Sequence, residues 1–447
     1  MAKLRYERPI IRQIDSGMPN KTGIRGINYI NQIDGVAIKD LIRDYGSPLF
    51  VVSERTIQKT YNDAVRAFST RYPKVQFAWS YKTNYNDAVC RIFHKMGSWA
   101  EVVSGYEYDK AIANGVDGSK IIFNGPDKSV DDLTKSIQNN SYIHIDNFDE
   151  LYTIIELSKK LNNRPKVAIR VNMNCGIQPI WDKFGFNYEN GEAWEAINRI
   201  MLSDAMDLVG LHTHIGTYIT VAWAYTNAVY KLADLAFHLR QKFNHNIKYI
   251  DMGGGFASKN TLRGAYLSGT DTCPTFDDYA DAISVALMNS NFDQKNMPTL
   301  ILETGRALID DAGSLLGTVL ANKRLSDGRR SMIIDTGVNI MFTAFWYDHV
   351  IMPAQDSSNY TEETCVYGPL CMNIDVIRPT ATLPLMRKGD NFVIVRVGAY
   401  NMTQWMQFIT YRPAIVLIDM AGKVHLIRKR ENMQSITDME QIPEYLA

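Results

Sequence analysis

Short runs rich in β-branched and aromatic residues alternate with longer segments of helical period from residue 72 onward. Eight such runs precede residue 310, at residues 77–81, 98–103, 121–124, 142–146, 167–172, 208–214, 249–252 and 300–303. Parallel strands joined by crossover helices produce this alternation. Because eight strand–helix units close a (β/α)8 barrel, we predict an α/β barrel of this kind.

Polar residues between the runs mark helix boundaries, and the rhythm of the chain changes near residue 310. Asp146 and Asn147 precede the helical run FDELYTIIELSKKL as capping residues, and Asn162 to Pro165 end it. Beyond residue 313 the chain shows β-rich segments without regular helices. We therefore expect residues 50–309 to form the barrel, and residues 1–49 and 310–447 to form a β-rich domain.

Composition narrows the class of partner. The chain has 447 residues and is 46% hydrophobic, enough for a large core. Its 48 basic and 48 acidic residues give a formal net charge of +0, which disfavours nucleic acid and anionic membranes and favours a small-molecule substrate.

The cysteine pattern and the lengths of the apolar runs indicate where the protein is located in the cell and whether it binds a metal. The five cysteines are widely spaced and form no CxxC pair, a pattern typical of reduced cytosolic thiols and not of a zinc site. The first residues carry charge without an apolar signal region, and no run approaches the roughly 20 apolar residues that span a bilayer. We expect a cytoplasmic protein with no bound metal.

Chemically capable residues follow nearly every predicted barrel strand. They are Lys82, Asn84, Glu101, Ser104, Asn124, Gly125, Arg170, Asn172, His212, His214, Thr217, Gly253, Gly254, Gly255, Glu303, Thr304, Gly305 and Arg306. The active site of such a barrel lies at the carboxyl ends of its strands. We therefore expect these side chains to converge on one site.

Lys82 and the triple glycine are the most specific of these features. An amine at the barrel mouth can react with an aldehyde cofactor if desolvation and neighbouring cations lower its pKa. Most single lysines at strand ends, however, are ion-paired or reach to solvent. Successive backbone N–H groups at Gly253 to Gly255 can cradle a phosphate with Thr217 and Arg306, although a tight turn also explains three glycines.

His214 and Glu303 each have a structural and a functional interpretation. A flat imidazole at the mouth could stack on a flat cofactor ring, whereas a single histidine is more often a satisfied core residue. A carboxylate buried at Glu303 is costly unless it pairs with a cation or a protonated ring nitrogen.

The chain resembles a known family in an ordered series of motifs over nearly its whole length. The motifs are DGVAIKDLIRDYGSPLFVVSE, YKTN, EVVSGYE, IIFNGPDKS, IDNFDEL, RVN, KFGF, HTHIGT, DMGGGF, ETGR, YGPLCMNID and VGAY. They resemble the fold-type III pyridoxal-phosphate decarboxylases, of the diaminopimelate decarboxylase type and more distantly the ornithine type. The resemblance implies an alanine-racemase-type barrel followed by a β domain, with pyridoxal 5′-phosphate as cofactor.

The resemblance also implies residue roles. Lys82 matches the lysine that binds the cofactor covalently, His214 the histidine that stacks on its ring, and Glu303 the carboxylate that pairs with the ring nitrogen. Around the phosphate or substrate it places Thr217, Gly253, Gly254, Gly255, Gly305, Arg306, Tyr347, Met372, Asp375 and Tyr400. Cys371 matches a cysteine that reaches into the partner's site, which implies a homodimer with shared active sites.

Two departures bear on the substrate. The cysteine motif usually reads CES in diaminopimelate decarboxylases, with a glutamate for the substrate's distal ammonium, whereas here Met372 follows Cys371. Thr343 and Ala344 stand where Arg-Pro would grip the distal carboxylate, and Ile340 replaces an aspartate. Unpaired groups at such a site change specificity strongly.

These departures lead us to expect a paralogue of specialised metabolism, acting for instance on citryl-amino acids in siderophore assembly, carrier-linked glutamate or basic amino acids. The first alternative is diaminopimelate decarboxylase of lysine biosynthesis with altered distal contacts. The second is an inactive regulatory homologue, against which the joint retention of Lys82, His214, Glu303 and Cys371 argues.

Overall fold

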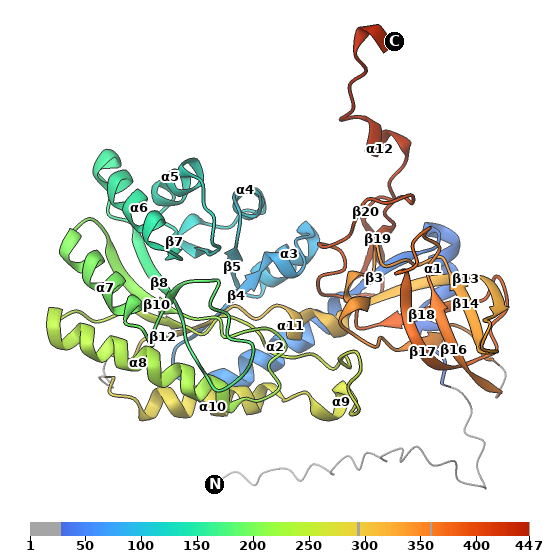
Figure 1. The fold of residues 1–447 in the computed structure, drawn as a ribbon, viewed down its shortest axis with the longest axis horizontal. Coiled ribbons are helices and arrows are strands. Elements are labelled where there is room, and N and C mark those ends of the chain that lie inside the picture. The colour runs from blue at the N-terminus through green and yellow to red at the C-terminus, as the bar shows by residue number, and fades with distance from the viewer. Residues whose placement is uncertain (1–27, 293–295, 358–359, 447) are drawn as a thin grey trace.

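The computed structural model describes residues 28–292, 296–357 and 360–446. The fold has a barrel ringed by helices and a separate region of mainly antiparallel strands (Figure 1). Residues 1–27, which we expected in the β-rich domain, lie outside the described residues. Within the described ranges, no helix is long and apolar enough to cross a membrane.

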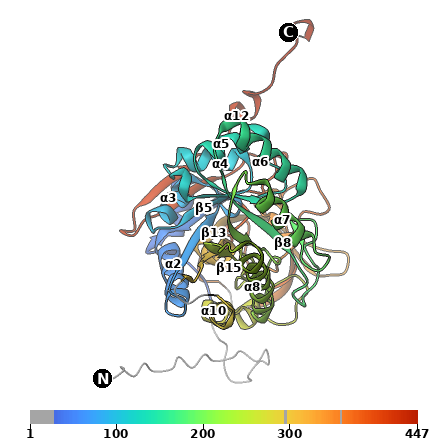
Figure 2. The ribbon, with the colours of Figure 1, turned by 90° about the vertical axis from the view of Figure 1, so that its left-hand side faces the viewer.

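The predicted eight-stranded barrel is confirmed. Its strands are β4 (Val75–Ser80), β5 (Trp99–Val102), β6 (Ile121–Phe123), β7 (Tyr142–Ile145), β8 (Lys166–Asn172), β10 (Asp207–His212), β11 (Tyr249–Asp251) and β12 (Thr299–Leu302). Every neighbouring pair is parallel, and pairing of β12 with β4 and of β8 with β10 closes the cylinder. Figure 2 shows the helices arranged around these central strands.

Helices cover the outside of the barrel, and local capping sets where they begin. They are α2 (Glu54–Ser69), α3 (Asp87–Lys95), α4 (Gly105–Ala113), α5 (Val130–Gln138), α6 (Phe148–Leu161), α7 (Glu192–Ser203), α8 (Trp223–Phe243) and α10 (Phe276–Asn289). Asn147 caps α6 as predicted, because its side chain accepts from the Glu150 N–H at 2.9 Å. Thr275 and Asp278 form a capping box at α10.

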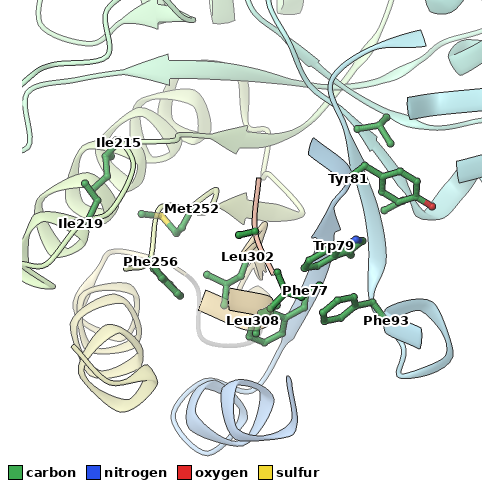
Figure 3. Close-up of a cluster of buried hydrophobic side chains, with 14 of the residues drawn as sticks. Phe77, Trp79, Tyr81, Phe93, Ile215, Ile219, Met252, Phe256, Leu302 and Leu308 are labelled. Atoms are coloured by element: carbon green, nitrogen blue, oxygen red, sulfur yellow. The ribbon is translucent and has the colours of Figure 1, made fainter. Parts of the chain in front are cut away.

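The core lies between the strands and these helices. Trp79 of β4 stacks on Phe93 of α3 with ring centroids 3.8 Å apart (Figure 3). Phe256 stacks on Tyr279 of α10 at 4.1 Å. Ala78, Ile122 and Ile301 belong to a separate buried cluster of strand residues, so both faces of the strands are buried, as is usual for a parallel sheet covered by helices.

The β domain is built around one long strand that follows the barrel. Its main strands are β3 (Leu49–Ser53), β13 (Gly313–Arg324), β14 (Arg330–Ile334), β15 (Ile351–Pro353), β16 (Thr361–Tyr367), β17 (Val376–Pro384), β18 (Asn391–Val395), β19 (Ala414–Ile418) and β20 (Val424–Arg428). Strand β3 pairs with β13 and β19 in this sheet. Residues 50–53 therefore belong to the β sheet and not to the barrel, because their backbone partners come from the C-terminal third of the chain.

The β domain also reaches the barrel mouth. The Tyr400 N–H donates to the carbonyl of Thr83 at 2.9 Å, and the Asn84 amide donates to the carbonyl of Gly398 at 3.0 Å. The loop that follows β18 is thereby fixed over the end of β4, next to Lys82.

Candidate active site

A cavity of about 910 Å³ opens at the carboxyl ends of the barrel strands. Its wall includes the predicted residues Lys82, His214, Thr217, Gly254, Gly255, Glu303, Gly305, Arg306, Tyr347 and Tyr400. The volume is in the range of small-molecule and cofactor sites. The strand ends therefore converge as the barrel prediction requires.

Lys82 lies in the short helix η1 (Tyr81–Thr83) directly after β4, with its amine inside the cavity. Nζ donates to Oε2 of Glu101 at 2.6 Å, and the Thr403 hydroxyl donates to the Lys82 carbonyl at 3.0 Å. Burial acts to lower the pKa of Lys82, but the carboxylates of Glu101 and Glu303 outweigh it and raise the pKa above its usual value. The expected lowering by neighbouring cations is wrong, because the nearest charged groups are anions.

Asn124, at the end of β6, links the two carboxylates of the site. Its amide donates to Glu101 at 3.1 Å and to Glu303 at 2.6 Å. Both carboxylates are almost completely buried, and buried anions require such donors. Lys82, Glu101, Asn124 and Glu303 therefore form one connected polar network at the base of the cavity.

Two imidazoles lie beside Glu303. Nε2 of His212 is 3.4 Å from Oε2, and Nδ1 of His144 is 4.0 Å from Oε1. Burial lowers the pKa of both histidines well below the usual value, with Arg170 adding to the effect at His212 and His212 adding to it at His144. Both rings are therefore neutral, and neither supplies a positive charge to Glu303.

The glycine loop after β11 approaches its neighbours too closely for a side chain. A Cβ at Gly253 would lie 2.6 Å from the Thr213 carbonyl, and one at Gly254 would lie 2.6 Å from the Glu303 carbonyl. Gly255 has φ +94°. Gly254 and Gly255 reach the cavity, whereas Gly253 does not and instead donates to Asp251 at 2.8 Å.

His214 faces the cavity beside this loop. Its Nδ1 accepts from the Gly254 N–H at 3.1 Å, and its ring centroid is 5.2 Å from that of Trp181. Burial, with Arg170 and Lys82 nearby, lowers the pKa of His214 well below its usual value. The ring is therefore neutral and its orientation is set by the backbone, as a stacking surface requires.

Arg306 supplies a buried cation opposite the network. Its guanidinium donates to the Tyr347 hydroxyl and, at 3.0 Å, to the Thr217 hydroxyl, and lies 4.7 Å from the Tyr400 ring centroid. Within the described ranges the guanidinium forms no ion pair at 4 Å or less. A phosphate or carboxylate in the cavity would supply the missing anion.

An aromatic wall was absent from our predicted site. Trp181 and Phe184, in the loop after β8, line the cavity together with Tyr218 and Trp346. Phe184 lies inside the KFGF motif, which could have indicated it, whereas Trp181 carries no comparable local signal. Its place follows only from the course of the loop across the mouth.

The predicted residues of the cysteine segment lie outside this cavity. Cys371 is exposed and Met372 packs at the edge of the core. Asp375 is buried and accepts from the N–H groups of Val338 at 2.8 Å and Leu370 at 2.7 Å. In the single chain Asp375 therefore has a structural role, because both carboxylate oxygens hold the backbone of its own domain.

Thr343 also has local partners. Its hydroxyl donates to Asn401 at 2.8 Å and accepts from the His349 imidazole at 2.8 Å, and its side chain is buried. Burial lowers the pKa of His349 to about 3, so this ring is neutral. Thr343 therefore ties the 342–349 segment to the loop that carries Tyr400, in place of the charged contact that an arginine would make.

Glu107 gives this region a pH-dependent stability. Burial, reinforced by Glu101, raises the pKa of Glu107 to about 7, while its carboxylate accepts from the Val103 N–H at 2.9 Å. The folded protein therefore binds this proton more tightly than the unfolded chain. Its contribution to the free energy of unfolding is present below about pH 4.5 and is lost as the pH rises to about 7.

Glu107→Gln is expected to flatten this part of the pH profile, because glutamine keeps the acceptor without the charge. Between pH 4.5 and 8 the wild type should lose about 3 kcal/mol relative to the variant. Urea unfolding of both proteins at several pH values measures the difference. Parallel pH profiles would show that Glu107 does not titrate abnormally.

The residues present fit pyridoxal phosphate. Glycines that cannot carry a Cβ and a neutral imidazole suit a phosphate and a flat ring, while Lys82 and Glu303 suit the aldehyde and the ring nitrogen. When bound, this cofactor supplies the electron sink for the carbanion left by departing CO2.

Comparisons with known proteins show the family to which the chain belongs. A family model described as the pyridoxal-binding domain of pyridoxal-dependent decarboxylases matches residues 56–310. Diaminopimelate decarboxylase of Methanocaldococcus jannaschii is 32% identical over 432 residues, covering 93% of this chain and 95% of the relative. The enzyme of that name from Aquifex aeolicus is 27% identical over 416 residues, covering 91% and 94%.

Solved structures give the same result. The M. jannaschii diaminopimelate decarboxylase in complex with L-lysine has a TM-score of 0.85 at 31% identity, covering 93% of this chain and 97% of that structure. A lysine/ornithine decarboxylase from Vibrio vulnificus shares the fold, with a TM-score of 0.73 at 19% identity over 86% and 97% of the two chains. The chain therefore belongs to the pyridoxal-dependent decarboxylases and is a carboxy-lyase that uses pyridoxal phosphate.

Proposed function

We propose that this chain decarboxylates meso-diaminopimelate to lysine. The observation that carries the proposal is similarity over nearly the whole chain to enzymes named diaminopimelate decarboxylase. The comparisons thus favour our first alternative over the paralogue of specialised metabolism. A neighbouring structure holds L-lysine, the product of such a reaction.

Arg306 supports this substrate from within the site. It is a buried cation on the cavity wall, and its fork is oriented by Tyr347 and Thr217. A planar guanidinium binds a carboxylate through two parallel hydrogen bonds. Arg306 can therefore hold a substrate carboxylate even though Thr343 offers no charge.

Lys82 and Glu101 are close enough to exchange a proton. The 2.6 Å contact between Nζ and Oε2 keeps the amine charged in the resting site. Transfer of that proton to Glu101 would leave the Nζ lone pair free, as a residue that holds an aldehyde cofactor requires, and its return would make Lys82 an acid again. Proton exchange with Glu101 thus determines when the Lys82 amine can act as a nucleophile.

Cys371 keeps its proposed role only in an assembly of two chains. Its thiol is exposed and outside the cavity of its own chain. We propose a homodimer in which this residue completes the partner's site and helps to reprotonate the product carbon. Met372 would then be presented to the same site.

A second candidate substrate has an uncharged distal end. Thr343 and Met372 replace charged groups of the family pattern, and Trp181, Phe184 and Trp346 give the cavity an aromatic wall. Because Thr343 and Met372 offer no charge to pair with a distal ammonium or carboxylate, an apolar or amide-bearing distal group fits this candidate, and the rings supply apolar surface for it. This candidate corresponds to the specialised-metabolism paralogue.

A panel assay decides between the two candidates. We expect kcat/KM for CO2 release from meso-diaminopimelate to exceed that from lysine, ornithine, glutamate and citryl-amino acids by at least about 100-fold, because a matched polar contact discriminates strongly. Lysine should form in equal amount to CO2. Turnover of another panel member with no release from diaminopimelate would transfer the assignment to the second candidate.

A further inference from the structure

Two buried aromatic side chains behind Glu303 have no role in the chemistry described so far. His144 on β7 and Tyr249 on β11 are 1% and 3% exposed, and Nε2 of His144 lies 2.9 Å from the Tyr249 hydroxyl. On the opposite side of the ring, Nδ1 lies 4.0 Å from Oε1 of Glu303. His144 is thus placed between the tyrosine and the carboxylate.

The contacts determine where the imidazole carries its hydrogen. Among the described residues, the Tyr249 hydroxyl has His144 as its one hydrogen-bond partner. Burial, with Asp251 nearby, raises the pKa of Tyr249 well above its usual value, so the hydroxyl keeps its proton. A buried O–H must donate, and Nε2 is the acceptor within reach. A neutral imidazole then carries its single N–H on Nδ1, facing Glu303.

The barrel is shaped to hold this arrangement. Gly210 of β10 lies beside Tyr249 in the parallel register, and a Cβ there would overlap the tyrosine ring. The His144 and His212 ring centroids are 4.5 Å apart at 33°. Lys128 donates to the His144 carbonyl at 2.9 Å. The imidazole therefore has little freedom to turn.

We propose that His144 and Tyr249 are positioning residues for this reaction: Tyr249 holds His144 in the Nδ1–H tautomer, and the partial positive charge of that N–H favours the ionised form of Glu303. At 4.0 Å from Oε1 the N–H acts electrostatically and not through a hydrogen bond. The proposal rests on the role of Glu303 in the proposed function. In the other tautomer a lone pair would face the carboxylate and disfavour its charge.

The groups around the pair are consistent with this assignment. Asn124 donates to the same Glu303 oxygen at 2.6 Å. The charged or titratable neighbours are the neutral His212, the cations Lys128 and Arg170, Asp251, and Tyr142, whose ring centroid lies 5.5 Å from that of Tyr249. Burial and the nearby Glu303 raise the pKa of Asp251 well above its usual value, which favours the uncharged form of Asp251 beside Glu303.

The same residues raise the alternative of a metal site. Ligand atoms of His144, His212 and Glu303 lie within 4.8 Å of one another, and all three residues are buried. Coordination by His144 would require an Nδ1 without hydrogen. The tautomer therefore separates the two possibilities, with Zn²⁺ as the probe.

The first experiment locates the hydrogen directly. Protein freed of cofactor and labelled with ¹⁵N-histidine should show the Nδ1–H tautomer for His144, with the signal assigned by its loss in His144→Phe. Tyr249→Phe should shift this signal toward the Nε2–H form, and Zn²⁺ should leave the wild-type signal unchanged. An Nε2–H tautomer in the wild type, or Zn²⁺ bound through Nδ1, overturns the proposal. This measurement does not depend on which amino acid the enzyme decarboxylates.

The second experiment tests whether the pair acts on the ring nitrogen. We expect Tyr249→Phe to bind pyridoxal phosphate about ten-fold more weakly, about 1.4 kcal/mol, but to bind 1-deazapyridoxal phosphate, which lacks that nitrogen, as the wild type does. Tyr142→Phe is the matched control, since it removes a hydroxyl two residues from His144 on the same strand, and it should change neither affinity. Equal weakening for both ligands would mean a structural role only.

A double variant completes the test. Because Tyr249 acts through His144, the combination of His144→Phe with Tyr249→Phe should weaken cofactor binding no more than His144→Phe alone. Additive losses would show that the two residues act independently and would contradict the proposal.

Discussion

Lys82→Ala should lower the rate of decarboxylation by at least about 10³-fold, the largest effect expected of any single substitution in this protein. The variant lacks the amine that we propose attaches the cofactor and exchanges a proton with Glu101, its partner at 2.6 Å. Loss of a group that serves both as nucleophile and as acid–base partner removes contributions that do not compensate each other. Steady-state CO2 release and the visible absorption of the cofactor-loaded protein measure the result.

The control for this substitution is Lys183→Ala. Lys183 lies beside Phe184 near the cavity, but its own side chain is not part of the cavity wall. We expect the control to keep full activity and normal absorption. A Lys82→Ala protein that is folded, active and spectrally unchanged would refute the assignment of Lys82. Thermal unfolding monitors the fold, because the variant leaves the Glu101 carboxylate without its ion pair.

Glu303→Gln is expected to lower kcat by about 10²–10³-fold, the usual effect of removing one preorganised electrostatic contact at a reacting centre. Glutamine preserves the shape of the side chain and can still accept the 2.6 Å hydrogen bond from Asn124. Glutamine carries no charge, so it does not stabilise the protonated form of a ring nitrogen beside it. The electron sink that decarboxylation requires is then weaker.

The change in KM distinguishes a role of Glu303 in the chemical step from a role in substrate binding. Because Glu303 is assigned to the cofactor and not to the substrate, KM should change little while kcat falls. Glu156→Gln provides a control on the outer helix α6, away from the cavity. A large rise in KM with kcat unchanged would move Glu303 from the cofactor to the substrate.

The barrel was predictable from sequence because its signals are local. A strand buried on both faces appears in the sequence as a short apolar run. The helix between two strands can be recognised from its hydrophobic period and its capping residue without knowledge of the fold. Asn147 shows this for α6, where one side chain and one N–H three residues away set the start of the helix. Lys82, His214 and Glu303 were placed at one site by the same reasoning, since parallel strands bring their carboxyl ends together.

Contacts between distant segments could not be read in this way. Strand β3 looks like any apolar strand, and only pairing with β13 and β19, more than 250 residues later, assigns it to the β domain. Trp181 enters the cavity because a long loop after β8 crosses the mouth. The motif around Asp375 predicts a substrate contact, but both oxygens of its carboxylate accept hydrogen bonds from backbone N–H groups.

The electrostatics of the site were also decided by tertiary structure. The expectation of a lowered pKa for Lys82 assumed neighbouring cations, and the sign reversed because β5 brings Glu101 to within 2.6 Å of the amine. A pKa depends on charges within a few ångströms and on burial, neither of which a linear pattern contains.

The sequence alone determined the barrel, the family and the identity of the residues at the strand ends, because strand period, helix caps and ordered motifs are properties of the chain itself. Tertiary structure decided which domain β3 joins, which charge faces Lys82 and which nitrogen of His144 faces Glu303. The two side-chain contacts join different parts of the chain at distances of 2.6 to 4.0 Å, and that proximity arises only when the chain folds.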